Sequence, residues 1–150
     1  MDYRLEVLTL PVTDVDRAAT FYTEGAGFVL DVDYHPTPEF RVVQLTPPGS
    51  ACSIQIGVGL TSAKPGSART TYLVVADIEA ARQHLTERGV TVSPIRHKSP
   101  IDGWKGGWEP GPDPEHGDYA SLADFADPDG NTWLVQEVGY YAGNAAIHGG

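Results

Sequence analysis

The sequence repeats itself at a spacing of 63 residues, and this duplication constrains the fold more than any other feature. Residues 12–18 correspond to residues 75–81 (75 − 12 = 63), and Thr23-Glu24 recurs as Thr86-Glu87. Each copy begins with an apolar, strand-like run, continues through an acidic helix start and an amphipathic helix, and reaches a glycine. Two copies of one supersecondary unit in 150 residues indicate a pseudo-symmetric fold. The interface between two such halves is a natural place for a ligand pocket.

The hydrophobic pattern predicts the same order of elements in both halves. Asp14 and Asp77 are good N-caps, and Val15, Ala18 and Tyr22 form an apolar stripe on the first helix. Alternating or continuous apolar runs predict strands around these helices. Each half is therefore expected to be βαβββ, with strands at residues 5–12, 28–34, 40–46 and 52–58 in the first half, and at 70–75, 90–95, 119–126 and 132–138 in the second.

The chain is expected to form one domain with an internal boundary. We place the first module at about residues 5–58, a linker at 59–69, the second module at about 70–138 and a tail at 139–150. The segment between Ile95 and Tyr119 breaks the symmetry, because it holds over 20 residues rich in Gly and Pro. Such a long irregular segment is usually functional or disordered, and its two tryptophans disfavour disorder. It is expected either to close over a pocket or to cover a sheet edge.

Composition excludes several partners and compartments. The formal net charge of −10 argues against nucleic acids and anionic membranes. The lone Cys52 excludes an intramolecular disulfide and a cysteine-based metal cluster. The first residues lack the basic and apolar regions of a signal peptide, and no apolar run approaches the ~20 residues of a membrane span. We therefore expect a cytoplasmic protein.

The repeat resembles the paired βαβββ modules of the vicinal oxygen chelate superfamily, which includes glyoxalase I, bleomycin-resistance proteins and extradiol dioxygenases. Residues 10–18 with Phe21-Tyr22 look like its opening strand and helix, and residues 125–131 look like its closing turn. The resemblance covers residues 5–138. It implies an α+β fold in which two βαβββ modules form a cupped, mostly antiparallel sheet around a cavity, and it implies a homodimer.

The resemblance also locates the positions of metal ligands in the metal-dependent members. Seven residues before each capping aspartate stand Val7 and Thr70, and three residues after the closing Asn131 stands Leu134. Valine and leucine cannot bind a metal ion, and threonine is a poor neutral ligand. No dinucleotide, nucleophile-elbow or zinc-peptidase motif replaces them. We therefore predict no metal and no cofactor. Glu6 and Glu137 would restore a metal site only if both turned inward.

A metal-free cavity would be lined by the strand positions that face inward, together with aromatic residues near the long loop. Such a mixture of apolar and neutral polar groups suits a largely apolar organic ligand. His97 is the best candidate for acid–base catalysis, because imidazole titrates near neutral pH, although no orienting carboxylate is evident nearby. The predicted ligand-binding residues are Val7, Thr9, Gln55, Thr70, Tyr72, Trp104, Trp108, Tyr119, Leu134 and Gln136, and Pro11 shares their strand parity.

The resemblance, taken together with these residues, leaves three functions open. The first is a metal-independent protein that binds a small aromatic or polycyclic compound such as an antibiotic, for which the acidic surface favours a cationic ligand. The second is a lyase or isomerase that uses His97 or a tyrosine as a proton carrier. The third is a metal-dependent glyoxalase or dioxygenase. Fold alone does not decide among them.

Overall fold

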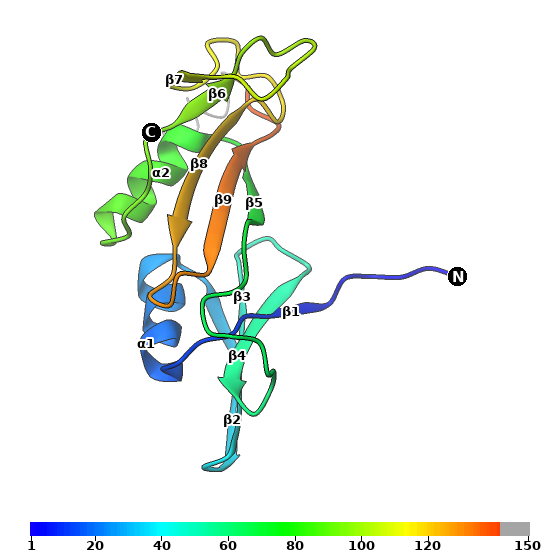
Figure 1. Cartoon of the computed structure of the whole chain (residues 1–150), viewed down its shortest axis with the longest axis vertical. Helices are drawn as coiled ribbons and strands as arrows, with labels where there is room; N and C mark the ends of the chain where they lie inside the picture. Colours follow the sequence, from blue (N-terminus) through cyan, green and yellow to red (C-terminus); the bar gives the residue numbers. More distant parts are fainter. Residues whose placement is uncertain (142–150) are drawn as a thin grey trace. The chain divides into compact units, whose positions relative to one another are not determined.

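The computed structural model describes residues 1–141, which divide into two compact units (Figure 1). The first unit combines Met1–Arg69 with Ala126–Thr132. The second combines Thr70–Phe125 with the chain from Trp133 onward. The predicted tail spans residues 139–150, and its residues from 142 onward lie outside the described residues. Within residues 1–141, no helix has the length and apolar character needed to cross a membrane.

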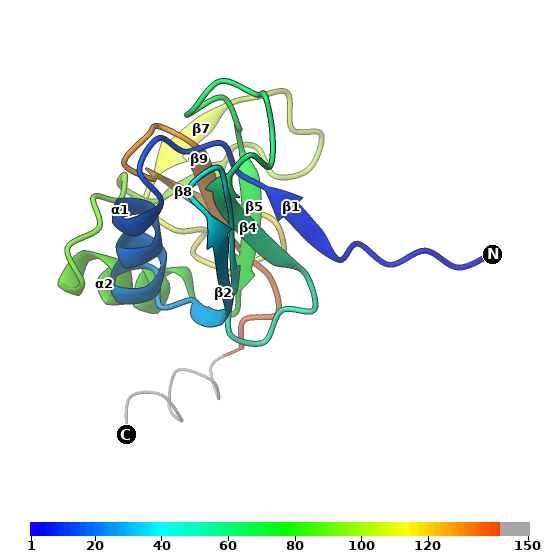
Figure 2. The same ribbon diagram turned by 90° about the horizontal axis from the view of Figure 1, so that it is seen from below.

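The first unit follows the predicted order of elements. Its four-stranded sheet has the order β1-β4-β3-β2, with β1 parallel to β4 and the other pairs antiparallel. The helix α1 continues directly into a π-helical turn, η1. Residues 1–6 are exposed and extend away from this sheet (Figure 2). The elements are β1 (Val7–Thr9), α1 (Val15–Thr20), η1 (Phe21–Gly25), β2 (Val29–Thr37), β3 (Phe40–Thr46) and β4 (Ser53–Val58).

Helix α1 begins at a cap that the sequence predicts. The Asp14 side chain accepts a hydrogen bond from the Arg17 backbone N–H at 3.0 Å, which satisfies a donor that a helix start leaves unpaired. The predicted stripe is buried at Val15, Ala18 and Tyr22, because α1 packs on the sheet face that carries the buried side chains of β3 and β4. Those side chains are Val43, Leu45, Ile54 and Ile56.

Arg41 joins α1 to the sheet by charge. Its guanidinium binds both carboxylate oxygens of Asp33, at 3.1 and 2.9 Å, and reaches Asp16 in the first turn of α1 at 2.9 Å. The hydrogen bonds from Arg41 lower the pKa of Asp33 below its ordinary value. The two acidic partners in turn raise the pKa of Arg41. This network fixes the start of α1 over the β2–β3 hairpin.

The closing turn, residues 126–132, belongs to the first unit although the chain on both sides of it belongs to the second. Asp127 accepts a hydrogen bond from the Tyr22 hydroxyl at 2.8 Å. Asn131 donates to the Pro11 carbonyl at 2.9 Å and accepts from the Ala68 N–H at 3.0 Å. Because these partners come from η1, the end of β1 and the linker, the turn connects three separate segments of this unit.

The second unit contains a five-stranded sheet of order β5-β9-β8-β6-β7. Strands β5 and β9 are parallel, and β6 is antiparallel to both β8 and β7. Figure 1 shows helix α2 beside this sheet. The elements are β5 (Thr71–Val75), α2 (Ile78–Glu87), β6 (Arg96–Lys98), β7 (Trp108–Pro110), β8 (Ser121–Ala126) and β9 (Thr132–Glu137).

Two details of the second unit differ from the sequence expectation. The strand expected at residues 90–95 is absent, and the strand that follows α2 is β6, at Arg96–Lys98. The long Gly- and Pro-rich segment also forms β7, which pairs with β6 at the edge of the sheet. Val90 and Val92 are buried as core side chains. The Arg82 side chain donates hydrogen bonds to the carbonyl oxygens of Val92 and Ser93, which leaves those groups unavailable to a neighbouring strand.

Candidate functional site

The sheet of the second unit has two faces of different character. Residues paired across neighbouring strands share a face, and the faces alternate along each strand. Trp133 and Glu137 lie on one face of the sheet. Trp133 stacks on Phe125, and the Glu137 side chain accepts a hydrogen bond from the first residue of α2. We call this the helix face. Tyr72 pairs with Leu134 and lies on the other side, which we call the Tyr72 face. Its members are Tyr72, Val74, Arg96, Lys98, Trp108, Pro110, Leu122, Asp124, Leu134 and Gln136.

The Tyr72 face gathers four of the predicted ligand residues, Tyr72, Trp108, Leu134 and Gln136. Tyr72 and Val74 are 54% and 58% exposed, whereas Leu134 and Gln136 are buried. Strands β5 and β7 lie at opposite edges of the sheet, four strand spacings of ~4.8 Å apart. The predicted residues therefore form two groups: one on β5 and β9, and one on β6 and β7.

The group on β6 and β7 combines tryptophans with cations. The Trp104 and Trp108 rings meet edge to face with centroids 5.1 Å apart. The Arg96 guanidinium lies 4.8 Å from the Trp108 centroid, and the Lys98 ammonium lies 4.8 Å from the Trp104 centroid. These are cation–π distances. Arg96 also pairs with Asp124 at 2.9 Å. We call Arg96, Lys98, Trp104 and Trp108 the cation–tryptophan cluster.

A groove of about 420 Å³ adjoins this cluster, a volume within the range of small-molecule sites. Trp108, Pro94, Ile95 and Pro110 supply apolar surface, and Arg96 supplies the positive charge. The lining also includes Ser93 and Glu109. Trp108, which is 40% exposed, offers this groove an aromatic surface.

Two predicted ligand residues adopt left-handed backbone conformations that non-glycine residues seldom adopt. Thr70, just before β5, has φ 59°, and Tyr119, just before β8, has φ 64°. Tyr119 is held there by hydrogen bonds at both backbone groups: its N–H donates to the Glu137 carbonyl, and its carbonyl accepts from the Gln136 side chain. Each such conformation costs on the order of 1–3 kcal/mol and is typical of functional sites.

His97 lies on the helix face, opposite the Tyr72 face, because it pairs with Ser121 on β8 and Glu109 on β7. Its Nδ1 lies 2.8 Å from the Gly111 carbonyl oxygen, and its Nε2 lies 3.7 Å from a Glu109 carboxylate oxygen. Glu109 is thus the carboxylate that the sequence did not identify. The structure does not bring His97 together with Tyr72, Leu134 and Gln136.

The first sheet places the other predicted residues on the face opposite α1. Val7 and Thr9 of β1 pair with Ser53 and Gln55 of β4. The Gln55 amide donates to the Thr9 hydroxyl at 2.7 Å. On the same face, Thr46 and Ser53 hydroxyls lie 2.6 Å apart. This surface offers neutral hydrogen-bonding groups beside Val7 and has no cluster of charges.

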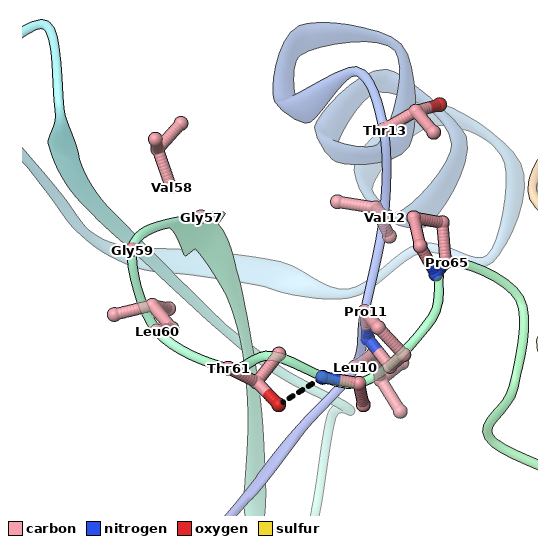
Figure 3. Close-up of a pocket in the computed structure, with 11 residues that line it drawn as sticks. Leu10, Pro11, Val12, Thr13, Gly57, Val58, Gly59, Leu60, Thr61 and Pro65 are labelled. Atoms are coloured by element: carbon pink, nitrogen blue, oxygen red, sulfur yellow. Dashed lines mark hydrogen bonds between the residues drawn. The ribbon is translucent and has the colours of Figure 1, made fainter.

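A separate pocket of about 280 Å³ lies at the end of β1 in the first unit. Figure 3 shows residues 10–13 on one side and the turn at residues 57–60 on the other. Pro11 is the only residue of the predicted strand face that lines this pocket. Small apolar side chains and backbone groups dominate its wall, so it offers few groups for chemistry.

The family's metal-ligand positions hold the residues that the sequence analysis identified, and neither nearby glutamate replaces them. Glu6 is exposed and precedes β1. Glu137 lies on the helix face, where both carboxylate oxygens already have partners. Within residues 1–141, no three His, Cys, Asp or Glu side chains are grouped as metal ligands. Val7 in the first unit and Leu134 in the second therefore each lack the donor atoms that a divalent cation needs.

Sequence reasoning missed the contact between a buried glutamate and a half-buried histidine. The Glu137 side chain is fully buried; one oxygen accepts the Ile78 N–H and the other lies 2.9 Å from Nδ1 of His116. His116 has φ 52° and stacks on Tyr140 with centroids 3.7 Å apart. The one available signal was the strand alternation that places Glu137 among buried positions. The 21-residue separation from His116 gave no local motif.

Comparison with known proteins links the chain to one family. The model of the "Glyoxalase/Bleomycin resistance protein/Dioxygenase superfamily" matches residues 4–135. The structure of TnmS3, an antibiotic binding protein from Streptomyces sp. CB03234, is similar with TM-score 0.67 and 29% identity, covering 91% of this chain and 96% of that one. A glyoxalase/bleomycin resistance protein from the same organism has TM-score 0.66 and 29% identity, covering 89% and 100%.

A superfamily member from Sphaerobacter thermophilus DSM 20745 has TM-score 0.67 and 27% identity, covering 91% of this chain and 98% of that chain. No curated protein sequence matches this chain significantly.

Proposed function

Because the chain belongs to the glyoxalase/bleomycin resistance protein/dioxygenase superfamily, we propose that it binds a small aromatic or polycyclic compound without a metal ion. The observation that carries this proposal is the Tyr72 face, where exposed aromatic side chains lie beside apolar and neutral polar groups. Aromatic surface with a few polar groups is the composition of small-molecule sites. The left-handed residues Thr70 and Tyr119 give further support.

The comparisons favour binding over catalysis. A structure with 29% identity is that of an antibiotic binding protein, and an antibiotic-like polycyclic compound is the ligand class we propose. Val7 and Leu134 at the metal-ligand positions support a metal-independent mode of binding. In this proposal the protein sequesters its ligand and returns it unchanged.

Thermal-shift screening of aromatic metabolites and polycyclic antibiotics tests the proposal. A ligand at a hundredfold excess over its Kd adds about 2.7 kcal/mol to the free energy of unfolding, which gives a clear rise in Tm. Tyr72→Ala should reduce this rise. Tyr3→Ala, which removes an exposed tyrosine outside both sheets, should leave it unchanged. Absence of any hit, or hits insensitive to Tyr72 and Trp108, would refute binding at this face.

Product analysis and elemental analysis separate the alternatives. If a hit is converted during prolonged incubation and His97→Ala abolishes conversion but not binding, the protein is a lyase or isomerase. If the protein purified without chelator carries a stoichiometric divalent metal, or EDTA abolishes binding, the metal-independent proposal is wrong. We expect the hit to return unchanged and EDTA to have no effect.

A further inference from the structure

The tryptophans of the second unit already have protein cations on their rings. Arg96 lies over Trp108 and Lys98 over Trp104, each 4.8 Å from the ring centroid. The negative face of an aromatic ring is the surface that would attract a cationic ligand. A ligand cation at this cluster would instead meet the positive charge of Arg96 or Lys98. These tryptophans are therefore poorly suited to a cationic aromatic compound, despite the net charge of −10.

The charges on the Tyr72 face near the cluster do not cancel. Asp124 pairs with Arg96 at 2.9 Å and compensates it. Lys98 has no carboxylate partner in the described part of the chain. Glu109 lines the edge of the groove, but it pairs with His97 across the strands, and strand alternation directs it to the helix face. Asp102 and Lys105, one of each sign, occupy the connecting turn. A single positive charge remains uncompensated beside two tryptophans.

We propose that the cation–tryptophan cluster selects aromatic ligands that carry an acidic oxygen, a carboxylate or an ionised phenol, against aromatic amines. This inference rests on the proposed function and specifies the ligand class at one part of the Tyr72 face. The ring system lies in the groove against Trp108 and Pro110. The acidic oxygen accepts a charge-assisted hydrogen bond from Lys98 or Arg96, which is about twice as strong as a neutral one.

Three naphthalene probes of nearly equal size test the charge preference by isothermal titration calorimetry: 1-naphthoate, 1-naphthalenemethanol and 1-naphthylmethylammonium. At low ionic strength the naphthoate should bind on the order of tenfold more tightly than the ammonium compound, as expected of one charge-assisted contact. The alcohol should lie between them. Because Arg96 and Lys98 are partly exposed to solvent, salt should reduce this preference. Equal binding of the three probes, or tighter binding of the ammonium compound, would overturn the proposal.

Matched variants test which side chain causes the preference for the naphthoate. Lys98→Gln should remove most of the advantage of the naphthoate over the alcohol, and Lys98→Arg should retain it. Lys64→Gln removes the same charge from the linker of the other unit and should have no effect. Lys98→Gln breaks no ion pair but removes the cation–π contact with Trp104, so its Tm should lie only slightly below that of the wild type. Persistence of the preference in Lys98→Gln and in Arg96→Gln would contradict the assignment.

These measurements distinguish a failure of charge selection from a failure of the proposed aromatic binding. If the alcohol and the naphthoate bind equally and Tyr72→Ala weakens both, aromatic binding stands and the charge selection is refuted. If Trp108→Leu leaves naphthoate binding intact, the ligand lies elsewhere and the cluster is not its site. If none of the probes binds, the cluster does not recognise acidic aromatics, whereas the wider screen still decides the proposed function.

Discussion

Glu137 shows how one buried side chain holds three segments of the second unit together. It lies at the end of β9, contacts the first N–H of α2 and pairs with His116 in the turn before β8. A buried carboxyl group is tolerated only when its oxygens have hydrogen-bond partners. Glu137 therefore has a structural role on the helix face, on the side of the sheet opposite Tyr72.

Glu137→Gln tests this role. The amide retains the size of the side chain but removes the negative charge, so the Ile78 N–H and His116 lose a charged partner. We expect a loss of about 1–3 kcal/mol in the free energy of unfolding, measured by urea denaturation. Glu39→Gln changes an exposed glutamate in the β2–β3 turn and should have little effect. Equal stability of both variants would show that the buried hydrogen bonds contribute nothing.

For individual residues, the sequence predicted which side chains share a strand face but not which partners they contact. Strand parity placed Tyr72, Leu134 and Gln136 together, because alternation is a local property of the chain. It gave His97 no partner, because Glu109 approaches it only through the pairing of β6 with β7. Contacts made across a hairpin depend on its register, and the Gly- and Pro-rich segment between these strands carries no periodic pattern that specifies one.

Among the elements, the linker depends on a glycine. Gly66 has φ 80°, and a Cβ at this position would overlap the Asp129 carbonyl oxygen of the closing turn. Its N–H donates to the Pro11 carbonyl. Gly66 therefore allows the linker to pass close to the backbone of the closing turn, which no other residue type permits.

Gly66→Ala should accordingly destabilise the protein more than a glycine substitution in open space. Gly49→Ala is the matched control, because Gly49 has nearly the same φ of 83° but a Cβ there would meet nothing within 4 Å. Both variants incur the cost of a left-handed alanine, about 1 kcal/mol. Only Gly66→Ala also displaces backbone, so its Tm should fall further. Similar Tm values for the two variants would mean that the linker shifts freely.

The elements themselves were predictable where burial and hydrogen bonding coincide. Strands β3 and β4 match residues 40–46 and 52–58 closely, because alternating side chains there also belong to paired backbone. The prediction of a strand at residues 90–95 was wrong, because burial and backbone pairing do not coincide there. Val90 and Val92 are buried, but the nearby carbonyls bond to Arg82 rather than to a strand. Apolar periodicity indicates which side chains are buried, and a buried side chain need not belong to a β-strand.

For the whole molecule, the family resemblance predicts a homodimer, and the first sheet offers a surface for one. Strand β2 forms the edge of its sheet, and its side chains Val29, Leu30 and Tyr34 are at least half exposed. Exposed apolar edge strands promote association. Size-exclusion chromatography with light scattering should give about twice 16.1 kDa. Val32→Lys on this strand should shift the population toward monomer; a wild-type mass of 16.1 kDa at all concentrations would contradict the prediction.

The repeated sequence pattern was sufficient to predict the α+β class, because each repeat contains the local signals of a complete βαβββ unit. It did not reveal where the closing turn packs. The local sequence at Asp127, Asp129 and Asn131 predicts only a tight turn between two strands. Their bonds to Tyr22, Thr13 and Pro11 span more than 100 residues of sequence, and no local pattern encodes such distant partners.

The position of the closing turn affects which segments of the gene can be exchanged by recombination. The chain passes between the two units three times, at residues 69–70, 125–126 and 132–133. A genetic exchange with a crossover after residue 69 would transfer α1 and its sheet but leave behind residues 126–132, which bind them. Recombination between diverged relatives is therefore expected to retain Tyr22 and Asp127 from the same parent, rather than to exchange residues 1–69 independently of residues 126–132.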